Sequence, residues 1–187
     1  VDTLAPVKSD SRLYIWQGDI TTLKCDAIVN ACNSQMLGCF SPMHACIDNF
    51  IHTYAGVELR LKMHEIMTKQ GHEEETGKAK ITSGYNLPAK YILHTVGPII
   101  QWEVTGKEEE LLASCYRECL KLAADTGAES VAFCCLSTGV FRFPQQRAAE
   151  IATETVKNYI NEDSRIKKVI FNVFKDDDLR IYHALIG

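Results

Sequence analysis

The spacing of apolar residues along the chain predicts an alternation of strands and helices. Short apolar runs, which are typical of buried strands, occupy residues 13–17, 25–30, 78–83, 91–96, 130–136 and 168–174. Segments in which apolar residues recur every three or four positions predict helices over residues 46–54, 57–69, 108–125, 144–160 and 177–185. This alternation predicts an α/β fold in which a parallel or mixed sheet carries helices on both faces.

Two loops after predicted strands are rich in small and polar residues. Residues 31–34 follow the second strand, and residues 137–141 follow the fifth. In sheets of this kind, ligands bind outside the carboxyl ends of the strands. The second loop, Ser137-Thr138-Gly139-Val140-Phe141, would let backbone amides approach a phosphate closely. An ordinary strand-to-helix turn would show the same pattern, so both interpretations stay open.

The charge balance narrows the classes of partner. The 187 residues include 20 Lys and Arg against 24 Asp and Glu, which gives a formal net charge of −4. Proteins that bind duplex nucleic acid neutralise phosphates with positive charge, so we expect no nucleic-acid partner. A single phosphorylated ligand held by backbone amides needs no positive charge and is compatible with this balance.

Polarity and cysteine content indicate a cytoplasmic protein. The longest uncharged stretch, residues 27–47, is too polar for a bilayer, so we expect no membrane partner. The eight cysteines are too sparse for a disulfide scaffold, which favours free thiols in a reducing compartment. We expect no signal peptide. The chain begins at Val1, and we expect a single domain over residues 1–187 in which residues 1–12 are an N-terminal extension or remnant.

Cys39, His44 and Cys46 lie within eight residues and form a candidate metal site. Thiolate and imidazole are ligands of Zn²⁺, and three of them leave a fourth position open, as in catalytic zinc sites. His44 and Cys46 would not face each other on a regular helix, so the next helix should begin at about His44 or later. Gly38 and Pro42 would let the loop fold back. Two apolar thiols beside one hydrogen-bonded histidine would fit the same residues, and the pattern leaves both interpretations open.

Several other polar residues have a structural as well as a functional interpretation. Asp19 follows the first strand and would cap a helix or turn there. Asn30 and Asn33 flank the end of the second strand, where asparagine side chains often form turns. His94 lies in an apolar strand and is expected to be a hydrogen-bonded core histidine, whereas residues 72–76 are expected to form a solvated turn.

Taken in order along the chain, several motifs resemble those of a macrodomain. They are Gly18-Asp19-Ile20-Thr21, Ile28-Val29-Asn30-Ala31-Cys32-Asn33, Ile51-His52 with Ala55-Gly56, and Ser137-Thr138-Gly139-Val140-Phe141. Residues 91–98 also resemble a recurrent macrodomain strand, and the resemblance extends from Leu13 to the C-terminus. It implies a three-layer α/β/α fold with a mixed central sheet and a cleft for ADP-ribose.

The resemblance also implies which residues contact ADP-ribose. Asp19 would accept a hydrogen bond from the adenine amino group, with Ile20 beside it. Phe174 would stack on the adenine, and the loop of residues 137–141 would wrap the diphosphate. Asn33 would bond the distal ribose, and Ile47 and Asp48 are also implied to contact the ligand.

One region departs from the usual macrodomain pattern. Most macrodomains have a glycine-rich loop here, whereas residues 38–49 of this chain resemble the zinc-dependent subclass found in bacteria and fungi. That subclass is often associated with an ADP-ribosylating sirtuin. The resemblance implies one Zn²⁺ per chain, bound by Cys39, His44 and Cys46 near the scissile bond.

The activity implied by the subclass is zinc-dependent hydrolysis of mono-ADP-ribose from aspartate and glutamate side chains of modified proteins. The implied catalytic residues are Asn33, Cys39, His44, Cys46 and Asp48. Asp48 would act as a base or orient a ligand, unless it only caps a helix. The sirtuin association suggests a lipoyl-carrier protein as the modified partner. Two other functions stay open, namely a non-catalytic ADP-ribose reader with a structural zinc and a deacetylase of O-acetyl-ADP-ribose.

Overall fold

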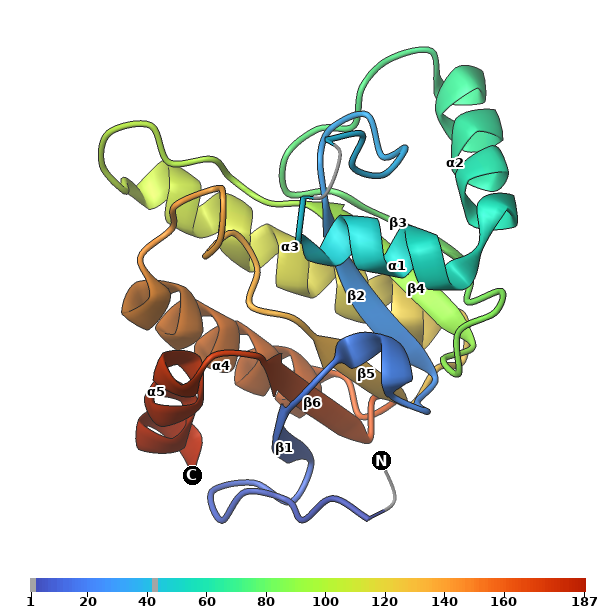
Figure 1. The fold of residues 1–187 in the computed structure, drawn as a ribbon. Helices are drawn as coiled ribbons and strands as arrows, with labels where there is room; N and C mark the ends of the chain where they lie inside the picture. Colours follow the sequence, from blue (N-terminus) through green and yellow to red (C-terminus); the bar gives the residue numbers. More distant parts are fainter. Residues whose placement is uncertain (1–2, 42–43) are drawn as a thin grey trace.

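A six-stranded sheet forms the centre of the protein (Figure 1). The computed structural model describes residues 3–41 and 44–187, so the predicted bend at Pro42 lies outside the described residues. The strands are β1 (Leu13–Gln17), β2 (Ala27–Cys32), β3 (Ala79–Ser83), β4 (Tyr91–Val96), β5 (Ser130–Phe133) and β6 (Lys168–Val173). Their order is β1-β6-β5-β2-β4-β3, and neighbours are parallel except for the antiparallel pair β3 and β4. The predicted mixed sheet is confirmed.

Helices cover both faces of this sheet, which makes three layers. They are the short 3₁₀ helix η1 (Ile20–Thr22) and the α-helices α1 (Ile47–Ala55), α2 (Val57–Gln70), α3 (Gly106–Asp125), α4 (Gln145–Glu162) and α5 (Asp176–Ile186). Figure 1 shows α1 in front of β2 and β4, with α3 and α4 behind the sheet. Among the described residues, no helix has the length and apolarity that spanning a bilayer requires.

Aromatic pairs anchor two helices to one face of the sheet. Phe133 of β5 and Phe171 of β6 are register partners, so their side chains point to the same face. Tyr116 of α3 lies 4.8 Å from Phe133 between ring centres, and Tyr182 of α5 lies 5.0 Å from Phe171. Because all four residues are buried, α3 and α5 pack on the same face of the sheet.

Local sequence explains where the helices begin and end. α3 begins two residues before its predicted start, because Thr105 and Glu108 form a reciprocal capping box at its N-terminus. α1 ends at Gly56, whose φ of +95° is one that glycine adopts without strain. α2 ends at Gly71 in the left-handed conformation. The predicted helix ends at both glycines are confirmed.

Two strand ends differ from the prediction at the edge where ligands are expected. β2 continues past Asn30 to Cys32, because it stays paired with β4 along its whole length. β5 ends at Phe133 rather than Leu136, and it pairs with β2 only near the start of both strands. β2 leads into α1, and β5 leads into α4 on the other face. The two strands therefore flank the switch point at which open α/β sheets bind ligands.

The predicted solvated turn at residues 72–76 is partly wrong. Glu74 is buried and forms an ion pair with Lys80, and its backbone amide donates to the carbonyl of Ser34 at 2.8 Å. The Ser34 hydroxyl in turn donates to the carboxylate of Glu73 at 2.6 Å. The segment packs against the loop after β2, because Ser34 offers it both an acceptor and a donor.

Residues ahead of β1 also contact the folded chain. The hydroxyl of Ser9 donates to the carbonyl of Ile186 at 2.7 Å, and the amide of Val7 donates to the carbonyl of Leu13 at 2.8 Å. These bonds tie the segment to α5 and to the start of β1. The assignment of residues 1–12 as an extension or remnant stays a prediction.

Candidate active site

The predicted ligand-binding residues all lie at one edge of the sheet, in loops or in a first helical turn. β1, β2, β4, β5 and β6 run parallel, so their carboxyl ends meet at that edge. Asp19 and Ile20 follow β1, and residues 33–48 follow β2. Residues 137–141 follow β5, and Phe174 follows β6. The topology thus brings together segments that are far apart in the sequence.

Cys39, His44 and Cys46 come together at the start of α1. Their candidate ligand atoms all lie within 4.8 Å of one another, and Cys39 Sγ is 3.2 Å from His44 Nδ1. Around a tetrahedral Zn²⁺, sulfur and nitrogen ligands stand about 3.5–3.8 Å apart, so both the donor types and their spacing fit this ion. α1 begins at Ile47 with Cys46 as its N-cap, which confirms the predicted helix start.

The two thiols of this cluster favour a cation beside them. Burial raises the pKa of the Cys46 thiol, and the neighbouring Cys39 raises it further. Two thiolates at this separation repel each other, so both lose their protons readily only where a positive charge compensates them. All three side chains are partly exposed, which leaves the cluster accessible to a ligand from solvent.

Asn33 joins the end of β2 to the segment that carries Cys39. Its Oδ1 atom accepts hydrogen bonds from the amides of Gln35 at 3.1 Å and Met36 at 3.2 Å. Its Nδ2 atom donates to the carbonyl of Gly38 at 3.3 Å. The turn-forming interpretation of Asn33 is confirmed, and its contact with the distal ribose stays a prediction.

A buried polar network surrounds the first turn of α1. Asp48 is buried, and its carboxylate accepts a hydrogen bond from Asn30 Nδ2 at 2.8 Å. His52 Nε2, one helical turn later, lies 3.6 Å from the same oxygen. Burial raises the pKa of Asp48 to about 6, against the opposing effects of the Asn30 hydrogen bond and the Arg60 charge. The Asp48 side chain thus bonds to β2 rather than to its own helix terminus.

Two histidines complete this network. His94 Nδ1 lies 3.2 Å from Asn30 Nδ2, and its Nε2 lies 2.9 Å from the Thr82 hydroxyl, which confirms the predicted core histidine. The sequence analysis names His52 only within a family motif and misses its pairing with Asp48, for which the spacing of four on one helix is the signal. Burial lowers the pKa of His94 to about 3 and that of His52 to about 4, so both rings are neutral at neutral pH.

The loop of residues 137–141 packs against the loop after β4. Ser137 has a φ of +63°, and its buried hydroxyl has no partner within the described part of the chain. A Cβ on Gly97 would lie 2.1 Å from Ser137 Oγ, so any side chain there would displace the Ser137 hydroxyl. Across the described residues, no group accepts a hydrogen bond from the amides of residues 139–141. Such amides can form an anion-binding nest.

Replacing Gly97 with alanine is expected to weaken ADP-ribose binding about tenfold or more. The added methyl group would displace the Ser137 side chain, and this shift at the start of the loop is expected to disturb the amides that follow. Calorimetric titration with ADP-ribose would measure the change. Gly106→Ala at the start of α3 is the matched control, because a Cβ there meets nothing within 4 Å. Equal affinities of the two variants would contradict the assignment of this loop to the ligand.

Asp19 and Phe174 lie just beyond β1 and β6. Asp19 Oδ1 accepts hydrogen bonds from the amide of Thr21 at 2.9 Å and from its hydroxyl at 2.7 Å, which confirms the capping interpretation. Asn172 Nδ2 donates to the carbonyl of Gly18 at 2.9 Å and so holds the loop. The Phe174 side chain is 77% exposed. The adenine contacts of both residues stay predictions.

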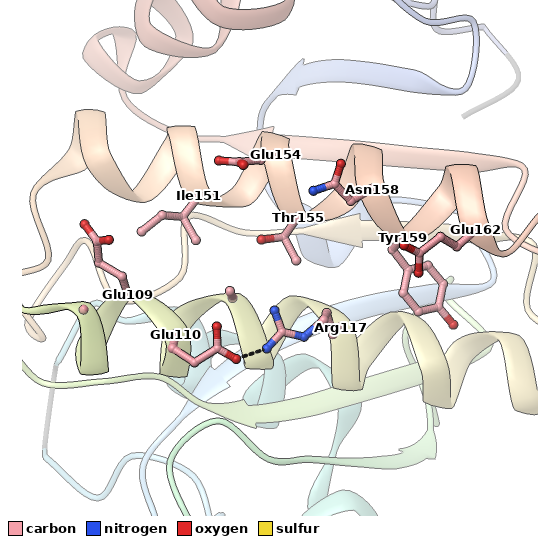
Figure 2. A pocket seen from close by; sticks show the side chains of 11 residues that line it. Glu109, Glu110, Arg117, Ile151, Glu154, Thr155, Asn158, Tyr159 and Glu162 are labelled. Carbon is pink, nitrogen blue, oxygen red and sulfur yellow. Dashed lines mark hydrogen bonds and ion pairs between the residues drawn. The ribbon is translucent and has the colours of Figure 1, made fainter.

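A hollow of about 400 Å³ lies away from this edge, between α3 and α4 (Figure 2). Its lining includes four glutamates, of which Glu110 forms an ion pair with Arg117. None of the predicted site residues lines it. Its acidic character also disfavours a diphosphate. The candidate site is therefore the edge where the loops after the parallel strands meet.

Comparison with known proteins agrees with this geometry. Residues 29–152 match the Macro domain family, and the chain belongs to that family. A crystal structure of a Trypanosoma brucei macrodomain in complex with ADP-ribose has a TM-score of 0.85 and 34% identity, covering 100% of this chain and 76% of that chain. The predicted macrodomain fold is thereby confirmed.

Two curated relatives share a name that describes an enzyme. A Treponema medium protein named protein-ADP-ribose hydrolase is 58% identical over 98% of this chain and 71% of its own length. A protein of the same name from Staphylococcus aureus (strain MSSA476) is 59% identical over 96% of this chain and 67% of its own length.

Proposed function

We propose that this protein is a zinc-dependent hydrolase that releases mono-ADP-ribose from aspartate and glutamate side chains of modified proteins. The observation that carries the proposal is the cluster of Cys39, His44 and Cys46 at the same sheet edge as the residues expected to bind ADP-ribose. Relatives named protein-ADP-ribose hydrolase, at 58% and 59% identity, support hydrolysis as the reaction. The macrodomain solved with ADP-ribose supports the ligand.

ADP-ribose would lie across the loops after β1, β5 and β6. The net charge of −4 is no obstacle, because the amides of residues 139–141 would carry the diphosphate. Oδ1 of Asp19 caps η1, so the second carboxylate oxygen of Asp19 would accept a hydrogen bond from the adenine amino group. The ring of Phe174 would supply an apolar face for the adenine.

Cys39, His44 and Cys46 would hold the metal ion. When bound, Zn²⁺ supplies polarisation of a substrate oxygen or a bound water with a pKa near about 7. Three protein ligands leave a position for substrate, which is the arrangement of catalytic rather than structural zinc sites. The partial exposure of all three side chains keeps that position accessible.

Asn33 and Asp48 would orient the distal ribose beside this cluster, with Ile47 against the ligand. The Asn33 amide is ordered by three hydrogen bonds, and the Asp48 carboxylate is fixed by Asn30. Because both groups are ordered before any ligand arrives, they would position the scissile bond at little entropic cost.

The proposal predicts release of free ADP-ribose from a protein modified on aspartate or glutamate. A protein modified on serine is expected to stay modified, because an alkoxide is a poorer leaving group than a carboxylate. Mass spectrometry of both substrates after the same incubation would measure release. Faster turnover of O-acetyl-ADP-ribose than of the modified protein would instead identify a deacetylase. ADP-ribose binding without release from any substrate would identify a reader.

The proposal extends to a lipoyl-carrier protein as the modified partner and to the cytoplasm as the location. The partner follows from the resemblance of residues 38–49 to sirtuin-linked macrodomains. All eight cysteines are free thiols, which is compatible with a reducing compartment.

A further inference from the structure

Arg60 of α2 contacts both neighbours of Cys39. Its guanidinium carbon lies 4.8 Å from the centre of the Phe40 ring, which is the geometry of a cation–π contact. Its Nη2 atom lies 3.1 Å from the position that a Cβ on Gly38 would occupy. One guanidinium group therefore touches the residue before and the residue after a candidate metal ligand.

Two side chains lie against the side of Gly38 on which a Cβ would stand. Its φ is +89°, and a Cβ there would also lie 3.0 Å from Cγ of His52. The imidazole of His52 and the guanidinium of Arg60 thus both lie on this one side of Gly38, while Asn33 Nδ2 donates to its carbonyl. Phe40, by contrast, is 62% exposed, and its ring contacts Arg60 of α2.

The corner between α1 and α2 brings Arg60 to this place. α1 ends at Gly56, and α2 begins at once, so Arg60 lies in the first turns of α2. Figure 1 shows the loop after β2 next to α2. No carboxylate of the described chain lies within ion-pair distance of Arg60, so the contact with Phe40 is not in competition with a salt bridge.

We propose that Arg60 is a positioning residue that clamps residues 38–40 and so holds the Cys39 thiol at the metal site. The inference rests on the proposed function, because it requires Cys39 to bind the ion. The clamp acts on Gly38 before the ligand and on the ring of Phe40 after it, and it needs no contact with the metal itself.

The test measures the Zn²⁺ affinity of the substrate-free protein by competition with a chromophoric chelator. Arg60→Ala is expected to bind Zn²⁺ about tenfold more weakly, as is typical when a residue that supports a metal ligand is lost. Arg60→Lys keeps the charge without the planar group and is expected to recover part of the affinity. Phe40→Leu removes the ring but keeps an apolar side chain, and is expected to weaken binding about threefold.

Lys62→Ala is the matched control, because Lys62 is an exposed cation on the same helix that pairs with Glu65. The Zn²⁺ affinity of Lys62→Ala is expected to equal that of the wild-type protein. The double variant of Arg60→Ala with Phe40→Leu is expected to bind no more weakly than Arg60→Ala alone, because the two side chains act through one contact. Co²⁺ substitution gives a second readout, in which the thiolate-to-metal absorption band changes in Arg60→Ala and not in Lys62→Ala.

If the wild-type protein binds Zn²⁺ tightly and Arg60→Ala binds it as tightly as Lys62→Ala, the clamp is overturned. That result would still support the metal centre. Loss of substrate binding in Arg60→Ala with unchanged Zn²⁺ affinity would also overturn the clamp, since the arginine would then contact the substrate. Failure of the unmodified protein to bind Zn²⁺ would overturn the metal centre itself, and the clamp with it.

Discussion

Replacing Cys39 with alanine is expected to lower the turnover of mono-ADP-ribosylated protein by more than about 100-fold. Loss of a group that only supports a metal ligand costs about 10- to 100-fold, and Cys39 is a candidate ligand itself. The ADP-ribose affinity of the variant is expected to stay within about threefold of the wild-type value. Asp19 and the loop of residues 137–141, which would bind the ligand, follow strands other than β2. Hydrolysis rates and calorimetric titration on the same protein would separate the two effects.

Cys25→Ala provides the control for removal of a thiol. Cys25 lies just before β2, at the opposite end of that strand from the cluster, and its thiol donates to the carbonyl of Ala27. Turnover by this variant is expected to match that of the wild-type enzyme. A parallel loss of turnover and of ADP-ribose affinity in Cys39→Ala would assign the metal a structural role.

Acid is expected to destabilise the protein through His94, and the neutral variant His94→Gln should reduce this loss. Burial lowers the pKa of His94 from an ordinary 6.5 to about 3. Between these two pKa values, His94 is protonated in the unfolded chain and neutral in the folded protein. The resulting stability is complete above pH 6.5 and is lost as the pH falls toward 3. Between about pH 6.5 and 4.5, the unmodified protein should lose about 2 kcal/mol more than His94→Gln.

Neighbouring groups contribute to the pH dependence of both proteins, and the charge of His52 also helps to lower the pKa of His94. His52, with a pKa of about 4, acts in the same direction as His94. Asp48, with a pKa of about 6, acts in the opposite direction, because the folded protein binds its proton first. Both groups, and the Arg60 charge beside them, are present in the protein and in the variant.

Urea unfolding at a series of pH values would measure the free energy of unfolding for both proteins. The variant His72→Gln, at an exposed position outside the network, serves as the control for replacing a histidine. Parallel curves for His94→Gln and the unmodified protein would contradict a buried neutral histidine at this position.

The pattern of apolar residues predicts most of the fold, because each strand and helix carries its own periodicity. The strand at residues 91–96 has its predicted limits, since β4 is buried between β2 and β3 along its length. The ends of β2 and β5 are not predictable in this way. β2 reaches Cys32 because β4 continues beside it, and β5 stops at Phe133 because its pairing with β2 ends early. Such limits are set by partners that the local pattern does not contain.

The candidate site shows the same division between local and distant contacts. The cysteine and histidine cluster is predictable, because its three members lie in one short loop. Gly97 and Arg60 are not, because their roles depend on residues in other elements. Gly97, in the loop after β4, faces Ser137 in the loop after β5. Arg60 of α2 contacts Phe40 in the loop after β2. Glu74 is buried for a similar reason, since the loop after β2 supplies the acceptor for its amide and β3 supplies Lys80 for its carboxylate.

The most direct test of metal-dependent hydrolysis compares ADP-ribose release by two samples of the protein. One sample is loaded with Zn²⁺, and a chelator has removed the ion from the other. The substrate is a protein that carries mono-ADP-ribose on aspartate or glutamate, and circular dichroism verifies that both samples are equally folded. Release is expected to stop on removal of the metal and to return when Zn²⁺ alone is added back. Release at an unchanged rate from the stripped protein would contradict a catalytic metal at Cys39, His44 and Cys46.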